Sequence, residues 1–181
     1  GFVKVSLISP KLEVGHPKFN VKEMLKALDH NPSAIAVFPE LATTGYSCGD
    51  LFFQNGLFKD NDLAVQYFLD NNRFEGIVIF GMPMLVEEMV LNTAVVVQGS
   101  KILGIVPKFY LPNAKEYYEK RWFNSGFDAV EQIKEVDYLD MLVPLGNLIF
   151  EHKDLQFGIE ICEDMWATIT PGNLLSVNGA N

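Results

Sequence analysis

Short apolar runs and amphipathic stretches take turns along the first half of the chain. Residues 3–9 combine an alternating pattern with β-branched side chains, while residues 34–38 and 76–80 are continuous apolar runs. Continuous runs of this length are typical of strands buried on both faces of a sheet. Residues 20–28, which open on an asparagine suited to capping, and residues 60–69 place apolar side chains at helical spacing. The pattern therefore predicts strands that alternate with helices.

The second half of the chain predicts hairpins rather than helices. Residues 91–98 and 101–106 are strand-like and flank a Gly-Ser pair, which is a two-residue turn signal. Residues 145–151 and 155–161 flank a polar turn in the same way. Residues 116–136 are aromatic and charged, and we leave their structure open. Early strand–helix alternation and later hairpins together indicate an α/β fold, with a mixed sheet covered by helices.

Composition and charge narrow the class of protein. Apolar residues make up 49% of the 181 residues and aromatic residues 12%, which argues against disorder. The net charge of −9 disfavours binding to a nucleic acid, and the apolar runs are too short to span a membrane. The two cysteines, Cys48 and Cys162, lie far apart and suggest neither a disulfide framework nor a zinc site. We therefore expect a cytoplasmic protein without nucleic-acid or membrane partners.

Three reactive side chains stand where predicted strands end. Glu40, Lys108 and Cys162 each lie one or two positions after a strand-like run. Open α/β sheets bind their ligands in crevices at the carboxyl ends of strands. If the strands are neighbours, a carboxylate, an ammonium group and a thiol converge in one pocket.

This trio has the parts that acyl transfer needs. A thiol becomes a strong nucleophile when it is ionised, and Glu40 can take its proton and return it to the departing amine. Lys108 can stabilise the oxyanion of a tetrahedral intermediate, helped by the backbone N–H of Glu163. The sequence thus predicts attack on an amide or nitrile carbon through a thioester on Cys162.

Simpler interpretations apply to each residue taken alone. A cysteine after an apolar run is more often a small buried hydrophobic residue than a nucleophile, and we assign Cys48 this structural role. A glutamate or lysine at a strand end is more often just solvated. We prefer Glu40 as the base because no histidine joins a signature. The three histidines are His16, His30 and His152.

Three segments, in order along the chain, resemble the signatures of the nitrilase, or carbon–nitrogen hydrolase, superfamily. Residues 38–46 read FPELATTGY, residues 108–113 read KFYLPN, and residues 158–166 read GIEICEDMW. The resemblance implies an αββα sandwich and a Glu–Lys–Cys triad. It extends from about residue 3 to about residue 175.

Residue roles follow from this resemblance position by position. The triad maps to Glu40, Lys108 and Cys162, and Glu116 matches a second family glutamate that orients the lysine and the substrate amide. Tyr46, in the first signature, is grouped with the substrate-binding or supporting residues.

Further segments resemble one branch, the glutamine-dependent NAD synthetases. Residues 45–52 read GYSCGDLF, residues 119–123 read EKRWF, residues 143–150 read VPLGNLIF, and Cys162 is followed by Glu-Asp. In that branch the domain hydrolyses glutamine, and its ammonia passes to an ATP-dependent synthetase domain that amidates deamido-NAD to NAD. The resemblance implies that Glu163 holds the amino-acid end of glutamine, a charge-assisted contact.

The resemblance also implies a larger protein. Residues 1–181 match only the first two-thirds or so of a nitrilase-like glutaminase domain, so we expect an incomplete α/β sandwich that is inactive alone. The remainder of that domain and the synthetase domain would follow it. The glutaminase domain needs no cofactor, whereas ATP and Mg²⁺ belong to the full-length enzyme. Family members generally form homo-oligomers, and we expect one here.

Two alternatives stay open at this stage. A free-standing amidase, nitrilase or carbamoylase would use the same triad on another small amide. A catalytically silent scaffold would keep the fold alone. Ala114 stands where the NAD synthetase branch commonly has a tyrosine that lines the glutamine pocket, which puts substrate affinity or selectivity in question.

Overall fold

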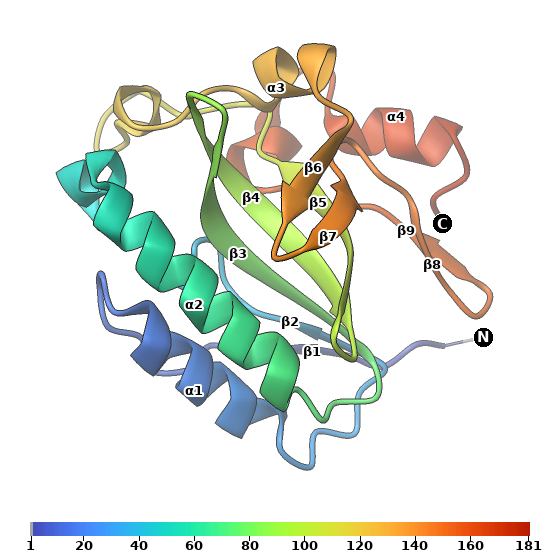
Figure 1. The fold of residues 1–181 in the computed structure, drawn as a ribbon. Helices are drawn as coiled ribbons and strands as arrows, with labels where there is room; N and C mark the ends of the chain where they lie inside the picture. Colours follow the sequence, from blue (N-terminus) through green and yellow to red (C-terminus); the bar gives the residue numbers. More distant parts are fainter. Residues whose placement is uncertain (1) are drawn as a thin grey trace.

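The chain folds around one mixed five-stranded sheet (Figure 1). The computed structural model describes residues 2–181. Its strands, in the spatial order β1-β2-β3-β4-β5, are β1 (Val5–Leu7), β2 (Ile35–Val37), β3 (Ile77–Val86), β4 (Met89–Gln98) and β5 (Lys101–Pro107). Strands β1, β2 and β3 are parallel, whereas β4 runs antiparallel to both β3 and β5. The carboxyl ends of β2, β3 and β5 therefore lie at the same edge of the sheet.

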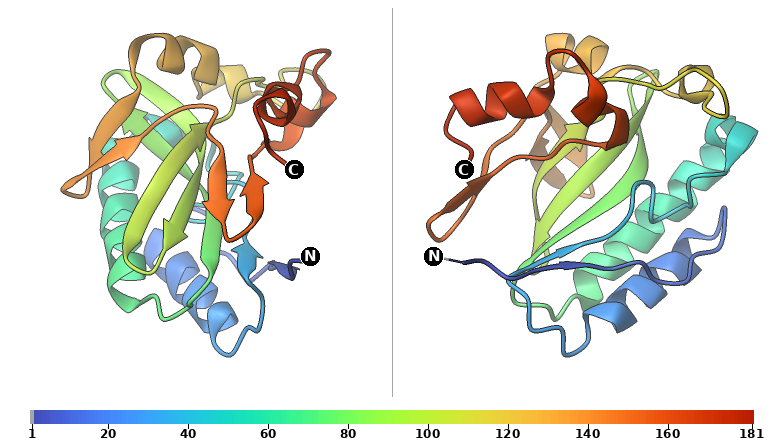
Figure 2. Two further views of the ribbon diagram at one scale, coloured as in Figure 1. Left: turned by 90° about the vertical axis from the view of Figure 1, so that its right-hand side faces the viewer. Right: turned by 180° about the vertical axis from the view of Figure 1, so that it is seen from behind.

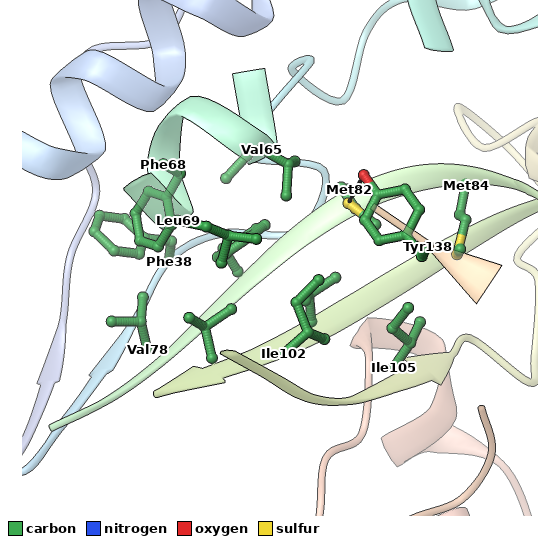
Figure 3. Close-up of a cluster of buried hydrophobic side chains, with 14 of the residues drawn as sticks. Phe38, Val65, Phe68, Leu69, Val78, Met82, Met84, Ile102, Ile105 and Tyr138 are labelled. Carbon is green, nitrogen blue, oxygen red and sulfur yellow. Dashed lines mark hydrogen bonds between the residues drawn. The ribbon is translucent and has the colours of Figure 1, made fainter. Parts of the chain in front are cut away.

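Helices and a small hairpin cover one face of the sheet (Figures 1 and 2). These elements are α1 (Pro17–Leu28), α2 (Asn55–Asn71), β6 (Glu135–Tyr138) and β7 (Met141–Pro144). Figure 3 shows the core on this side, where Phe68 of α2 lies near Phe38 and Val78, and Tyr138 of the hairpin packs beside Met82 at the other end. Phe68 and Phe80 pack with their ring centroids 5.1 Å apart.

A second hairpin covers part of the opposite face (Figure 2). It consists of β8 (Phe150–His152) and β9 (Leu155–Phe157), and α4 (Pro171–Val177) follows it. Phe150 and Ile161 pack against Ile79 and Val96 of the sheet. Both faces of β3 and β4 are thus buried, which explains their continuous apolar sequence.

Short helical segments connect these elements. They are the 3-10 helices Gly49–Phe53, Glu119–Arg121 and Cys162–Trp166, and α3 (Gly126–Gln132). No helix within residues 2–181 is long and apolar enough to cross a membrane.

The predicted class is confirmed, while several boundaries are wrong. Strand β3 continues past residue 80 to Val86 and pairs with β4 across a turn in which Glu87 has a φ of 54°, a hairpin that the sequence did not predict. Helix α1 begins at Pro17, so Asn20 is no cap. Asn20 is instead fully buried, and its Nδ2 donates to the carbonyls of Glu13 and Thr43.

The later part of the chain differs in two ways. Residues 116–136, left open, contain a 3-10 helix and α3, and the β6–β7 hairpin beside them was not predicted. Residues 155–161 were expected to form one strand, but β9 ends at Phe157. Gly158 lies against Leu175 of α4, so the chain here packs on a helix rather than on another strand.

One glycine determines how closely the sheet approaches the turn that carries Glu40. An ideal Cβ added at Gly81 on β3 would lie 2.2 Å from the backbone nitrogen of Leu41 and 2.8 Å from the Cα of Glu40. No other residue type leaves that space free, so Gly81 is required by packing rather than by its φ.

We expect Gly81→Ala to lower the free energy of unfolding by about 1–3 kcal/mol, the usual cost of overpacking. The added methyl group would push the Glu40 turn off the sheet, since backbone atoms cannot yield as a flexible side chain can. Urea unfolding measures the effect. Gly56→Ala is the matched control, because nothing lies within 4 Å of its Cβ position. Equal stability of the two variants would contradict the prediction.

Candidate active site

Lys108 lies at the centre of the site. It directly follows β5, and its backbone N–H donates to the carbonyl of Asn92 on β4 at 2.8 Å, which continues the pairing of the strands. The side chain is completely buried, and Nζ donates to Glu40 Oε1 and Glu119 Oε1, both at 2.7 Å. A buried ammonium group needs such acceptors because an unpaired buried charge is very costly.

Glu40 reaches Lys108 from the turn after β2. This turn is fastened to β3 because the N–H of Gly81 donates to the carbonyl of Pro39 at 3.2 Å. Strands β2 and β5 are not neighbours, since β3 and β4 lie between them. The gap is bridged by the long side chain of Lys108 and by Asn92, whose Nδ2 donates to Glu40 Oε1 at 2.6 Å. Nothing in the sequence pattern pointed to Asn92.

The second carboxylate on the lysine is Glu119 rather than Glu116. Glu119 is buried, and its Oε1 accepts from Lys108 Nζ and from the hydroxyl of Tyr46, each at 2.7 Å. Glu116 is exposed, three positions earlier in the same irregular segment. The contact expected of Glu116 is therefore made by Glu119. Glu119 is the first residue of the EKRWF segment noted in the sequence. The residues around it show no helical or strand periodicity, so the sequence does not indicate which glutamate faces the interior.

Cys162 lies in the segment that follows the β8–β9 hairpin, which covers the other face of the sheet. It opens the 3-10 helix Cys162–Trp166 with a φ of 49°, a left-handed conformation that costs a non-glycine residue about 1–3 kcal/mol. The residue is exposed, and together with Glu40 it lines a cavity of about 160 Å³. Thr93, Ala94 and Ile161 contribute to the wall of this cavity. The three predicted residues are thus brought together from three separate parts of the chain.

The thiol is not ionised in advance by its surroundings. Partial desolvation and the Glu40 carboxylate raise the pKa of Cys162, Lys108 lowers it, and Glu119 and Glu163 raise it further. The net shift is upward. A cysteine in this site needs a base to remove its proton. The carboxylates of Glu40 and Glu160 line its cavity. Glu160 accepts the N–H of Gly172 at 2.7 Å, whereas the charge of Glu40 acts on the thiol, so Glu40 is the candidate base.

Lys108 is held as the cation. Burial by itself lowers the pKa of Lys108, but the adjacent carboxylates of Glu40 and Glu119 outweigh burial and raise it overall. Burial raises the pKa of Glu119 as well, in spite of its bonds to Lys108 and Tyr46. Burial and the Glu119 carboxylate raise the pKa of Tyr46, so its hydroxyl remains a donor. A positive charge is therefore fixed beside the position of the thiol.

The remaining predicted residues lie around this centre. Glu163, next to the nucleophile, is half-buried. Ala114 is exposed. The hydroxyl of nearby Tyr110 already has a hydrogen-bond partner, because it donates to the carbonyl of Ile169 at 2.8 Å. Cys48 is buried, and its thiol lies 3.2 Å from the carbonyl of Thr44 as expected for a structural cysteine.

Two of the segments that resemble the synthetase branch, residues 45–52 and 119–123, contact each other beside the site. Asp50 accepts from Nε and Nη2 of Arg121 at 2.9 and 3.0 Å, and from the indole of Trp122 at 3.0 Å. Arg121 and Trp122 lie two and three positions after Glu119, while Asp50 lies four positions after Tyr46. These contacts thus join the segment of Tyr46 to the segment of Glu119, whose carboxylate accepts from both Tyr46 and Lys108.

The arrangement supports covalent acyl transfer. It offers a protonated thiol, a carboxylate that can accept its proton, and a fixed ammonium group for an oxyanion. Within residues 2–181, no group of three or more histidine, cysteine, aspartate or glutamate side chains is placed to hold a metal ion.

Comparison with known proteins gives a consistent picture. The family model described as carbon–nitrogen hydrolase matches residues 18–171. A curated glutamine-dependent NAD(+) synthetase of Mycobacterium tuberculosis is 32% identical over 188 aligned positions, covering 99% of this chain and 27% of the relative. A synthetase of the same name from Thermotoga maritima is 29% identical over 97% of the chain and 28% of its own length. The chain therefore spans a little over a quarter of these relatives.

Solved structures agree on the fold. The glutamine-dependent NAD+ synthetase of Acinetobacter baumannii matches with a TM-score of 0.81 and 26% identity, over 99% of this chain and 31% of that one. A carbon–nitrogen hydrolase of Helicobacter pylori matches with a TM-score of 0.72 over 98% of this chain and 57% of that one. Its 18% identity supports the shared fold alone. The predicted nitrilase-like α/β fold is thereby confirmed.

The charges around Cys162 lead to a pH prediction. In the wild type, the midpoint of the pH dependence of iodoacetamide alkylation should lie above about 8.5, the ordinary thiol value. Glu40→Gln should lower that midpoint, because it removes a negative charge that raises the pKa of Cys162. Mass spectrometry of the labelled peptide reports the rate at each pH.

Two controls make this measurement specific. Cys162→Ala should abolish labelling, since Cys48 is buried. Glu88→Gln removes an exposed carboxylate at the β3–β4 turn and should leave the midpoint unchanged. An unchanged or raised midpoint in Glu40→Gln would contradict the arrangement of charges described above.

Proposed function

Because this chain belongs to the carbon–nitrogen hydrolase family, we propose that it hydrolyses glutamine to glutamate and ammonia through a thioester on Cys162. The single observation that carries the proposal is the pairing of Lys108 Nζ with both Glu40 and Glu119 beside a cavity that Cys162 lines. The choice of glutamine is supported by the synthetase names of the relatives that match along nearly the whole chain.

Acylation begins with the transfer of the thiol proton of Cys162 to the carboxylate of Glu40. The thiolate attacks the side-chain amide carbon of glutamine, and the resulting oxyanion is stabilised by the ammonium group of Lys108 and the backbone N–H of Glu163. Glu40 then gives the proton to the amide nitrogen, the C–N bond breaks, and ammonia leaves. Cys162 is left as a thioester of glutamate.

Deacylation uses the same three groups, with water in place of the thiol as the attacking group. Glu40 takes a proton from a water molecule, the hydroxide attacks the thioester carbonyl, and Lys108 again stabilises the oxyanion. The C–S bond breaks, the thiolate of Cys162 recovers the proton from Glu40, and glutamate leaves. A base that works in both halves must be open to the substrate, and Glu40 is half-buried at the cavity.

Substrate selection is proposed for residues at the rim of the site. Glu163, half-buried beside Cys162, would accept hydrogen bonds from the α-ammonium group of glutamine. Tyr46, whose hydroxyl is held by Glu119, would support the lysine network and line the substrate path. The exposed Glu116 is not retained in this role.

The chain would act within a larger enzyme. We propose that residues 1–181 form part of a glutaminase domain, joined to a synthetase domain that uses ATP and Mg²⁺ to amidate deamido-NAD with the released ammonia. The glutaminase part itself requires no cofactor, since its side chains supply the nucleophile, base and cation. We also propose a cytoplasmic homo-oligomer. The free-standing amidase is less well supported, because the named relatives are synthetases.

Removing the nucleophile tests the mechanism. In the full-length protein, Cys162→Ala should reduce glutamine-dependent NAD formation to background while NAD formation from added ammonium salt stays near the wild-type rate. Ammonia does not need the thioester, which is why the two activities separate. Cys48→Ala is the matched control and should retain both activities. Persistence of glutamine hydrolysis in Cys162→Ala would refute the proposal.

Replacing Glu163 tests the substrate contact. Glu163→Gln keeps the size of the side chain and its backbone N–H but removes the charge. We expect the KM for glutamine to rise about tenfold or more, with a smaller change in kcat, since a charge-assisted hydrogen bond is worth about 1.5–3 kcal/mol. Steady-state kinetics of glutamate release measure both constants. A fall in kcat at constant KM would assign Glu163 to the chemical step instead.

A further inference from the structure

A buried carboxylate outside the triad joins the strand of the lysine to the turn of the cysteine. Asp164 lies two positions after Cys162 and is fully buried. Its Oδ1 accepts the backbone N–H groups of Phe109 and Tyr110, at 3.0 and 2.8 Å, and its Oδ2 accepts the N–H of Ile161 at 3.1 Å. Every one of these donors is within two positions of a triad residue.

Within residues 2–181, no strand pairing connects the two parts of the chain that supply these N–H donors. Phe109 and Tyr110 directly follow Lys108 in the segment just after β5, while Ile161 precedes Cys162 beyond the separate β8–β9 hairpin. One carboxylate therefore bonds both segments at once. Burying a carboxylate costs free energy unless its oxygens are bonded, so the position is stable only while both segments stay in place.

The same side chain closes the strained turn of the nucleophile. The N–H of Asp164 donates to the carbonyl of Ile161 at 3.1 Å, and its Oδ2 accepts the N–H of Ile161 in return. Cys162 lies inside this closed loop with its φ of 49°. A non-glycine residue keeps a left-handed conformation only where its surroundings impose it.

We propose that Asp164 is a positioning residue of the site, which holds the Cys162 turn in its left-handed conformation and fixes it against the backbone that carries Lys108. The role rests on the proposed glutaminase mechanism, because it concerns the placement of the thiol relative to the oxyanion-stabilising cation. Asp164 takes no part in proton transfer, since all of its bonds are to backbone N–H groups. A shift of about 1 Å between reacting groups can cost about a hundredfold in rate. Loss of the hydrogen bonds of Asp164 should therefore slow the reaction.

Asp164→Asn in the full-length protein is the test. The amide can accept the N–H groups of Phe109 and Tyr110 with its oxygen, but its NH₂ group then faces the N–H of Ile161, and that bond is lost. We expect kcat for glutamine hydrolysis to fall about tenfold to a hundredfold. KM for glutamine should rise as well, because Glu163, the proposed contact to the ammonium group of glutamine, lies in the same turn.

The pH dependence of alkylation of Cys162 distinguishes positioning from a simple loss of charge. The charges that act on this thiol are Glu40, Lys108, Glu119 and Glu163, and among them only Lys108 lowers its pKa. Loosening the turn moves the thiol toward water and away from Glu40, and burial and Glu40 are the two largest causes of its raised pKa. The midpoint should therefore fall toward the ordinary thiol value in Asp164→Asn and also in Asp164→Glu, which keeps the charge. Removal of a nearby negative charge alone would lower the midpoint in Asp164→Asn only. An unchanged or raised midpoint in Asp164→Glu overturns the proposal.

Asp62→Asn is the matched control for general destabilisation. Asp62 on α2 is a half-buried carboxylate that accepts the hydroxyl of Tyr138 at 2.9 Å, on the helical side of the sheet. This variant should lose stability without a change in kcat or in the alkylation midpoint. Equal kinetic effects in the two variants overturn the specific role of Asp164.

Two further measurements keep the outcomes separate. Asp164→Glu is measured beside Asp164→Asn, and it carries the test alone if Asp164→Asn does not fold. It keeps the charge but displaces the oxygens, and a fall in kcat and a fall in the midpoint are expected. Wild-type kinetics in Asp164→Glu would overturn the proposal. Glutamine hydrolysis that survives Cys162→Ala overturns the proposed function, whereas the alkylation midpoint still tests Asp164, because iodoacetamide needs no substrate.

Discussion

The site depends on one buried cation held between two carboxylates. Lys108 is completely enclosed, and the protein stabilises its charge with Glu40 on one side and Glu119 on the other. Partial burial and the Glu40 carboxylate raise the pKa of the neighbouring Cys162 thiol, and Lys108 lowers it by less than they raise it. This differs from cysteine sites that store a thiolate beside a positive partner. In the proposed mechanism the nucleophile is generated at the moment of reaction, by a carboxylate that is itself held by the cation.

The fold is arranged to make that pairing possible. Strand β2, which is parallel to β3, places Glu40 at the same edge of the sheet as Lys108, which follows β5. The antiparallel β4, between β3 and β5, carries Asn92, whose side chain donates to the Glu40 carboxylate. Gly81 lets the Glu40 turn lie directly on β3. The hairpin on the other face brings Cys162 to the edge from outside the sheet. Each reactive group is thus positioned by its own element. The hydrogen bonds of Asp164 join the segment that follows Lys108 to the segment that precedes Cys162.

Much of this architecture could be predicted from the pattern of apolar residues. The runs at residues 34–38 and 76–80 were recognisable as buried strands because both of their faces are apolar, and the Gly-Ser turn revealed the β4–β5 hairpin. The β3–β4 hairpin escaped notice because its turn contains two glutamates and no glycine or asparagine. Asn20 looked like a helix cap, yet the fold buries it as a bridge between two loops, a role that depends on chain segments far apart in sequence.

By itself the sequence determined the chemistry: a thiol, a carboxylate and an amine at strand ends, in segments that resemble one family. These are local properties, carried by residue type and by a few neighbours on either side. The tertiary structure alone decided which glutamate contacts the lysine, because Glu116 and Glu119 share one irregular segment and only packing turns Glu119 inward. It also decided that Asp164 joins two triad segments, since two of its donors, Phe109 and Tyr110, are more than fifty positions away, just after β5. Burial and long-range hydrogen bonds are properties of the folded chain, and no local pattern encodes them.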